Sequence, residues 1–219
     1  MAVITDRKGE GLYTIEPMAA AGFEALYALY AAAFPVSEQK PKAQLHALVN
    51  DPDYAVYTVS GPEGLEGFAV FFAAETAPFF LLEYLAVAPR NRSKGIGSRL
   101  LRDSLAALFA QRRRKPVLIE IDAVDASGKD GGISRKREAF YRRNGCTKIL
   151  GFDYILGLKS DRPAPPMELM LFDPGRTGIG REILRRWVET VYEKVYGRSR
   201  NVPEIARMFA DLPPTLPLG

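Results

Sequence analysis

The sequence predicts an α/β fold, in which strands and helices alternate along most of the chain. With 219 residues and 47% apolar composition, the chain is long enough to bury one sizeable core. Short apolar segments bounded by turn residues indicate strands, and apolar residues recurring every three or four positions indicate helices. A sustained apolar stripe from Ile179 to Tyr196 predicts an additional C-terminal amphipathic helix.

The breaks between these segments set the order of the elements. Phe34-Pro35 ends the first helix because proline disfavours the helical conformation of its predecessor, and Gly61–Gly64 is a typical hairpin turn. Ser134 is expected to cap a late helix that ends at Asn144-Gly145. The predicted strands cover residues 11–16, 55–59, 65–73, 79–88, 117–121, 148–158 and 167–172. The predicted helices cover residues 19–33, 41–49, 95–109, 134–143 and 179–196.

The last part of the chain differs from the rest. We expect residues 1–172 to form the main domain and residues 173–219 to form an added helix and tail. The helix would bury its stripe on the domain or in a partner subunit, which makes a homodimer one of two alternatives. Four prolines in the tail, Arg198 to Gly219, predict an arm or a loosely ordered terminus.

Composition removes several classes of function. A single cysteine, Cys146, excludes an internal disulfide, and a single histidine, His46, removes most zinc sites, so no metal is expected. The polar stretch Met1–Glu10 has no apolar signal core, and the longest apolar run, Ala77–Ala88, is too short to span a bilayer. We therefore expect a cytoplasmic protein without a membrane partner.

One segment carries a chemical signal, because an apolar strand leads through a glycine-containing loop into a helix. It reads Leu85-Ala86-Val87-Ala88-Pro89-Arg90-Asn91-Arg92-Ser93-Lys94-Gly95-Ile96-Gly97-Ser98. Backbone N–H groups at a helix start bind anions, and glycines let a phosphate approach the backbone closely. Arg90, Arg92 and Lys94 add positive charge, so the loop predicts a pyrophosphate cradle. The structural alternative is a tight connection with incidental surface cations.

This segment resembles the acetyl-CoA motif of the GNAT superfamily of N-acyltransferases, through Arg92-x-x-Gly95-x-Gly97 after the strand ending Val87-Ala88-Pro89. A second match lies in Phe140-Tyr141 shortly before Gly145, although Cys146 stands where many members have phenylalanine. The resemblance implies a mixed central sheet of about seven strands flanked by helices. It also implies transfer of an acetyl or other acyl group from acetyl-CoA, the co-substrate, directly to a primary amine.

The resemblance also suggests which residues hold the co-substrate. The strand backbone at Leu85, Ala86 and Val87 would bind its pantetheine arm. The loop would hold its pyrophosphate with residues Arg92, Ser93, Lys94, Gly95, Ile96, Gly97 and Ser98. No asparagine follows the 117–121 strand, where many members place one against the pantetheine arm.

Glu83 is the first candidate for the general base. Alternation places it on one strand face with Leu81 and Leu85, so an otherwise apolar row holds one carboxylate. Burial raises the pKa of a carboxyl group, and a raised pKa suits a base that removes the amine proton. The alternative is a salt-bridged or solvated Glu83 with a purely structural role.

Two further residues complete the expected site. Tyr141 resembles the tyrosine that protonates the departing thiolate in this family, although an aromatic residue on a helix is more often part of the core. Glu38 lies in the Phe34–Glu38 connection, where the acceptor often enters, and could hold a cationic amine. A solvated loop glutamate is the alternative.

Two other functions remain open from the sequence. The basic runs at residues 111–115, 135–137 and 142–143 suggest nucleic-acid binding, but no recognition motif accompanies them and exposed faces explain them. A module that binds acyl-CoA without turnover, as a sensor or assembly partner, is the second alternative. The presence of both Glu83 and Tyr141 favours chemistry.

Overall fold

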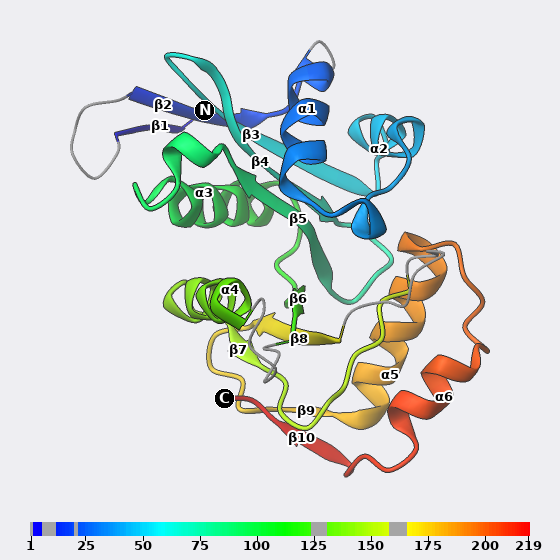
Figure 1. Ribbon diagram of the computed structural model, residues 1–219. Helices are drawn as coiled ribbons and strands as arrows, with labels where there is room; N and C mark the ends of the chain where they lie inside the picture. The colour runs from blue at the N-terminus through cyan, green and yellow to red at the C-terminus, as the bar shows by residue number, and fades with distance from the viewer. Residues whose placement is uncertain (1, 6–11, 20–21, 124–130, 158–165) are drawn as a thin grey trace. The chain divides into compact units, whose positions relative to one another are not determined.

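A computed structural model describes residues 2–5, 12–19, 22–123, 131–157 and 166–219 of the chain (Figure 1). These residues fall into two compact units. The first spans Met1–Thr76 and Leu82–Arg114, and the second spans Ala77–Leu81 and Lys115–Gly219. Each unit combines strands with helices, so the α/β class is confirmed.

The first unit is built on strands that follow one another in the order β1-β2-β3-β4-β5. Neighbouring strands from β1 to β4 are antiparallel. The strands are β1 (Ala2–Thr5), β2 (Leu12–Pro17), β3 (Tyr54–Gly61), β4 (Gly64–Phe72) and β5 (Phe80–Val87), of which β5 belongs to this unit from Leu82 onward. The helices are α1 (Phe23–Ala33), the short η2 (Val36–Glu38), α2 (Lys42–Val49), the short η3 (Pro89–Asn91) and α3 (Ile96–Gln111).

Two helices enclose the sheet of the first unit. The ring of Tyr30 on α1 contacts that of Phe68 on β4, whereas the side chain of Leu100 on α3 lies beside the preceding residue, Gly67. Successive residues of a strand point to opposite faces, so α1 and α3 cover opposite faces of the sheet. This explains why the strands are apolar without alternation: both faces of β4 are buried.

The second unit contains a sheet segment and a helical C-terminal part. Its strands run in the order β6-β8-β7, all antiparallel. They are β6 (Val117–Asp122), β7 (Thr147–Lys148) and β8 (Met167–Phe172), with a separate pair β9 (Gly178–Gly180) and β10 (Thr215–Pro217). The helices are α4 (Gly131–Arg143), α5 (Arg181–Thr190), its π-helical continuation η4 (Val191–Val195) and α6 (Pro203–Phe209).

Two predicted boundaries are wrong. The strand expected at residues 148–158 is regular only at Thr147–Lys148, because Gly151 takes a left-handed conformation (φ 72°) and turns the chain. Leu158 lies outside the described residues. The helix expected from Ser134 already begins at Gly131, so Ser134 is a buried residue inside α4 rather than its cap.

The C-terminal tail is ordered, which contradicts the expectation of a loose arm. Pro203 stands in the first turn of α6, where a missing N–H is harmless. β10 pairs with β9, and the N–H groups of Lys148 and Leu150 donate to the carbonyls of Gly219 and Pro217 (2.8 and 3.0 Å). The tail therefore completes the hydrogen bonding of segments that precede it by many residues.

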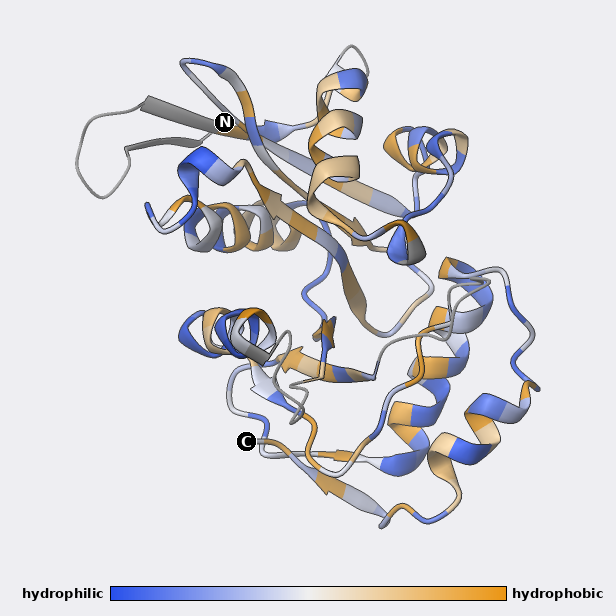
Figure 2. Cartoon of the chain, in the orientation of Figure 1, coloured by the Kyte–Doolittle hydropathy of each residue, from blue (hydrophilic) through white to orange (hydrophobic). Residues whose placement is uncertain are grey.

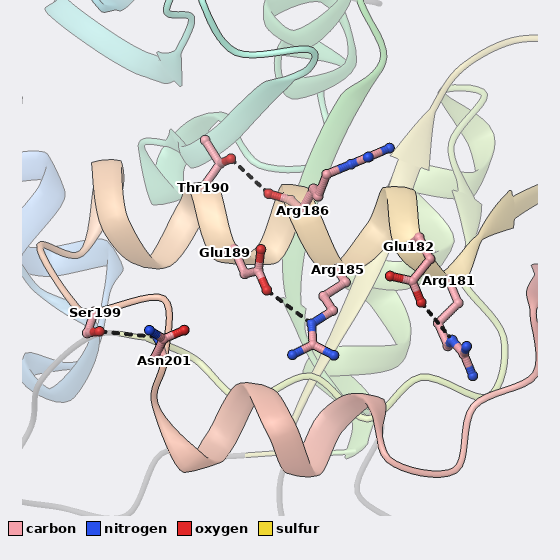
Figure 3. Close-up of polar contacts among 8 residues, drawn as sticks. All are labelled: Arg181, Glu182, Arg185, Arg186, Glu189, Thr190, Ser199 and Asn201. Atoms are coloured by element: carbon pink, nitrogen blue, oxygen red, sulfur yellow. Dashed lines mark hydrogen bonds and ion pairs between the residues drawn. The ribbon is translucent and has the colours of Figure 1, made fainter.

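The C-terminal apolar stripe is buried inside the second unit. Leu184, Trp187 and Val188 on α5 are buried, and the Trp187 ring lies 5.2 Å from that of Phe79. Figure 2 shows apolar and polar residues alternating along α5. The polar side carries Arg185, whose Nε lies 3.0 Å from the Glu189 carboxylate (Figure 3).

Replacing Trp187 tests whether this stripe is core. Trp187→Ala should lower the free energy of unfolding by about 3–5 kcal/mol, because a large buried ring leaves a cavity. Ile183→Ala, on the same helix but 37% exposed, should change it by less than about 1 kcal/mol. Trp187 is the only tryptophan of the chain, so its replacement removes the tryptophan fluorescence signal. Urea unfolding of both variants is therefore followed by circular dichroism. Equal losses would contradict the assignment.

Candidate active site

The turn between β5 and α3 is formed by two residues with left-handed backbone conformations. Ser93 has φ 66° and Gly95, the residue before α3, has φ 88°. Glycine adopts this conformation readily, whereas serine does so rarely. The turn reverses the chain and presents the first turn of a 16-residue helix at the end of the strand.

The predicted cradle residues come together at this helix start. The N–H of Arg99 donates to the carbonyl of Gly95 (3.1 Å), so the N–H groups of Ile96 and Gly97 precede the first bond within the helix. They lie at the positive end of the helix dipole. Arg92 and Ser93 are exposed, and Lys94, Gly97 and Ser98 are partly exposed.

Ile96 differs from the other cradle residues, because its side chain is buried in the core. Only its backbone N–H is therefore suited to a phosphate. The arrangement as a whole fits a pyrophosphate: backbone donors, a helix dipole and cationic side chains converge on one loop.

The strand that leads into this turn is held close to its neighbour. A Cβ atom at Gly67 on β4 would lie 2.7 Å from the carbonyl oxygen of Ala86 on β5. Ala86 is buried, whereas Leu85 and Val87 are partly exposed. Gly67 therefore sets the position of the backbone at Leu85–Val87, which the sequence predicts to bind the pantetheine arm.

Gly67→Ala should push the β5 backbone away at Ala86. We expect the free energy of unfolding to fall by about 1–3 kcal/mol, since the clash involves backbone rather than a flexible side chain. Gly132→Ala is the matched control, because its added Cβ meets nothing within 4 Å. Chemical denaturation of both variants checks the expectation, and equal stabilities would refute the close approach.

Glu83 forms a buried ion pair that the sequence did not reveal. The ammonium of Lys40 lies 2.8 Å from Oε1 of Glu83, and both side chains are almost fully buried, at 4% and 2% exposed. This is the salt-bridged arrangement that the structural alternative expected. Lys40 was missed because a single lysine in a polar connection carries no local signal.

The surroundings of Glu83 act on its protonation in opposite directions. Burial raises the pKa of the Glu83 carboxyl above its usual value. Lys40 opposes this shift, as do the hydroxyls of Tyr84 and Tyr54 to a smaller degree. Burial outweighs the partners, so the net direction is upward.

The connection that carries Glu38 is tied to the same cluster. The Tyr84 hydroxyl donates to the carbonyl of Glu38 (3.2 Å), and the N–H of Lys40 donates to the Tyr30 hydroxyl (2.7 Å). The structure thus brings Glu38, Lys40 and Glu83 into one neighbourhood. The Glu38 side chain is partly exposed.

Tyr141 belongs to the second unit, where it lies on α4 with its ring buried. Burial raises the pKa of its hydroxyl above the usual range, while the nearby Arg137 guanidinium opposes the shift. Arg137 is itself paired with Asp122 at the end of β6. The neighbouring ring of Phe140 meets Tyr141 edge to face, with 5.1 Å between the centroids.

Several cations of the basic runs contact their own unit. Arg112 donates to the carbonyls of Ala73 (2.6 Å) and Pro52 (2.8 Å), and Arg142 pairs with Glu138 (2.7 Å). These contacts explain part of the basic runs by local structure.

Among the described residues no helix is long and apolar enough to cross a membrane. In the same part of the chain, no group of three or more His, Cys, Asp or Glu side chains could hold a metal ion.

Sequence comparison relates the chain to known acetyltransferases. The model of the acetyltransferase (GNAT) family matches residues 23–126, which include the whole segment from β5 to α3. YjbC of Bacillus subtilis strain 168, a protein named as an acetyltransferase, is 28% identical over 163 residues. The match covers 74% of this chain and 77% of YjbC.

Solved structures share the fold. A protein of Bacteroides thetaiotaomicron, named as a GNAT-family acetyltransferase, matches with TM-score 0.65 and 20% identity over 84% of this chain and 98% of its own. The ribosomal-protein-S18-alanine N-acetyltransferase of Escherichia coli matches with TM-score 0.56 and 16% identity, covering 73% and 92%. Spermidine N-acetyltransferase of Vibrio cholerae, solved with CoA and spermine, matches with 0.55 and 12%, covering 73% and 94%.

These similarities confirm the expected mixed sheet flanked by helices, with additional helices at the C-terminus. The family match, the named relative and the shared fold agree with the strand, loop and helix described above. Residues 23–126 thus match the GNAT acetyltransferase family, and the similarities together support membership of the GNAT superfamily and an acyl-CoA N-acyltransferase activity.

Proposed function

We propose that this enzyme transfers an acetyl group from acetyl-CoA directly to a primary amine. The observation that carries the proposal is the turn at Ser93 and Gly95, which presents a helix N-terminus beside two cations, Arg92 and Lys94. In this proposal the loop from Arg92 to Ser98 binds the pyrophosphate. The backbone of Leu85, Ala86 and Val87 aligns the pantetheine arm and polarises the thioester carbonyl.

Glu83 is proposed to remove the proton of the attacking amine. An alkyl amine with pKa near 10.4 is almost wholly protonated at neutral pH, so a proton acceptor is needed. The raised pKa of Glu83 makes it a better acceptor than an ordinary carboxylate. Its pairing with Lys40 means that proton uptake must loosen a buried ion pair, which makes Lys40 a regulator of the basicity of Glu83.

Tyr141 is proposed to supply the proton to the departing thiolate. Its pKa is raised, so the phenol stays protonated at neutral pH, which is the form that donates. Residues 1–172 would form the catalytic domain in this proposal, and residues 173–219 an addition to it.

The acceptor is proposed to enter beside the connection between α1 and α2. Glu38 there can attract a cationic amine, and its backbone is held by Tyr84, a neighbour of Glu83 on β5. Val36, at the tip of the same connection, is 82% exposed, so the acceptor would meet an apolar side chain beside a carboxylate.

A thiol-release screen tests the proposal. Purified protein is incubated with acetyl-CoA and longer acyl-CoAs against classes of primary amine, with mass spectrometry of the products. Amine-dependent release of free CoA with matching acetylation supports the proposed reaction. CoA binding without thiol release across the panel would favour the non-catalytic sensor, and salt-dependent binding to generic DNA without CoA binding would favour a nucleic-acid partner.

Tyr141→Phe should lower kcat by about 10²-fold and leave the Kd for acetyl-CoA within about twofold, since it removes only the donated proton. Steady-state kinetics and calorimetry measure the two quantities. Tyr192→Phe is the matched control, because it removes another tyrosine hydroxyl of the same unit, one that donates to the carbonyl of Ile155 (2.7 Å). An unchanged kcat in Tyr141→Phe would remove Tyr141 from the mechanism.

The pH profile of kcat/KM tests Glu83. A base acts when deprotonated, so a raised pKa predicts that activity falls on the acid side at a pH above the ordinary carboxyl value of about 4.3. Glu83→Gln should lose this limb and about 10²-fold in rate. Lys40→Met should move the limb to higher pH, because Lys40 lowers the pKa of Glu83. A purely structural Glu83 predicts the same profile in all three proteins, with lower stability only.

A further inference from the structure

We propose that Glu66 is a positioning residue for co-substrate binding, acting through Asn91 to hold the loop from Ala88 to Gly95. This inference rests on the proposed function, because it assumes that the loop binds the phosphates of CoA. Glu66 lies on β4, outside the segment that the sequence singled out. A carboxylate beside an anion-binding loop is unexpected on charge alone.

Glu66 is joined to the loop by three hydrogen bonds. Its buried carboxylate, 2% exposed, accepts from Nδ2 of Asn91 (2.5 Å) and from Nη2 of Arg90 (2.9 Å). Its backbone carbonyl accepts from the N–H of Ala88 (2.8 Å). One residue of β4 therefore fixes three positions of the loop, all of them before the left-handed turn.

Asn91 links Glu66 to Lys94, one of the cations of the predicted pyrophosphate cradle. An ionised carboxylate only accepts hydrogen bonds, so the Asn91 amide must turn its NH₂ group toward Glu66. Its oxygen Oδ1 then points the other way and accepts from Nζ of Lys94 (3.1 Å). The position of the Lys94 ammonium thus depends on the buried Glu66 carboxylate through a single intervening side chain, Asn91.

The backbone of the loop needs such support. Ser93 occupies the left-handed region, with φ 66°, between Asn91 and Gly95. A non-glycine residue stays in this region only where its surroundings hold it there. The bonds from Glu66 secure the loop immediately before this residue, and α3 secures it immediately after.

The three cations of the segment, Arg90, Arg92 and Lys94, have two different roles. Arg90 faces the carboxylates of Glu66 (2.9 Å) and Glu63 (3.1 Å), so its charge compensates acidic groups of its own unit. Arg92 and Lys94 then supply the charge for phosphate. The Glu66 carboxylate is compensated where it lies and does not repel the ligand strongly.

The direction in which Glu66→Gln changes the affinity for CoA distinguishes a positioning role from a purely electrostatic one. Glu66→Gln removes a negative charge near the loop, so electrostatics alone predicts unchanged or slightly tighter CoA binding. Positioning predicts the reverse, because Gln cannot accept from Arg90 and Asn91 as a carboxylate does. We expect the Kd for CoA to rise about tenfold, with KM for acetyl-CoA rising in parallel and kcat at saturation within about twofold.

Calorimetry with CoA should be carried out on the full chain. Asn91→Ala should weaken CoA binding to a similar degree. The double variant should bind little worse than either single variant, because both substitutions disrupt the same Glu66–Asn91 hydrogen bond. Asp103→Asn is the matched control: it removes a carboxylate paired with Arg99 (2.8 Å) on α3, outside the loop, and should leave Kd unchanged. Asn91→Ala also keeps the test open if Glu66→Gln does not fold.

Comparison with Arg92→Glu distinguishes failure of this inference from failure of the proposed function. Arg92→Glu opposes the phosphate charge directly and should abolish most CoA binding if the cradle is correct. Loss in Arg92→Glu, together with unchanged or tighter binding in Glu66→Gln and Asn91→Ala, overturns the positioning role alone. Absence of CoA binding by the unaltered protein overturns the proposed function and this inference with it.

Discussion

The turn from β5 into α3 is the constraint on which the proposed donor site depends. Ser93 and Gly95, both with left-handed backbone conformations, turn the chain so that α3 begins at the end of β5. Without them the N–H groups of the first helical turn would not face the end of the strand. The positive end of the α3 dipole, equivalent to about half a charge, would then lie elsewhere.

Two buried carboxylates in the first unit each bind a residue of a connecting segment. Glu66 is hydrogen-bonded to Asn91 in the loop before α3, and Glu83 pairs with Lys40 in the connection that also carries Glu38. Removing one partner of a buried ion pair typically destabilises a protein by about 3–5 kcal/mol, because it leaves an uncompensated charge. This cost applies to Glu83, whose partner Lys40 is buried, whereas Arg90, the partner of Glu66, is 48% exposed. A mutation at Glu83 therefore affects stability as well as chemistry, and a pH profile separates the two effects.

The sequence predicted best those features that short segments determine. The strand, glycine loop and helix from Phe79 to Phe109 were recognised because period, turn residues and charge all lie within one stretch. Lys40 and Glu66 were missed because their partners, Glu83 and Asn91, lie 43 and 25 positions away. The ordered tail was missed for the same reason: its prolines suggested a loose arm, while its hydrogen-bond partners lie at Lys148 and Leu150.

The same distinction explains why the donor is easier to infer than the acceptor. In the proposed donor site phosphate is bound by backbone N–H groups and the helix dipole, which a local motif specifies. The acceptor connection is instead fixed by distant side chains, among them Tyr84 on β5 and Tyr30 on α1. Exposed residues such as Val36 can therefore change without disturbing these anchors or the phosphate loop. In the proposed site, different residues therefore determine donor binding and acceptor binding, so a substitution in the acceptor connection can change one without the other.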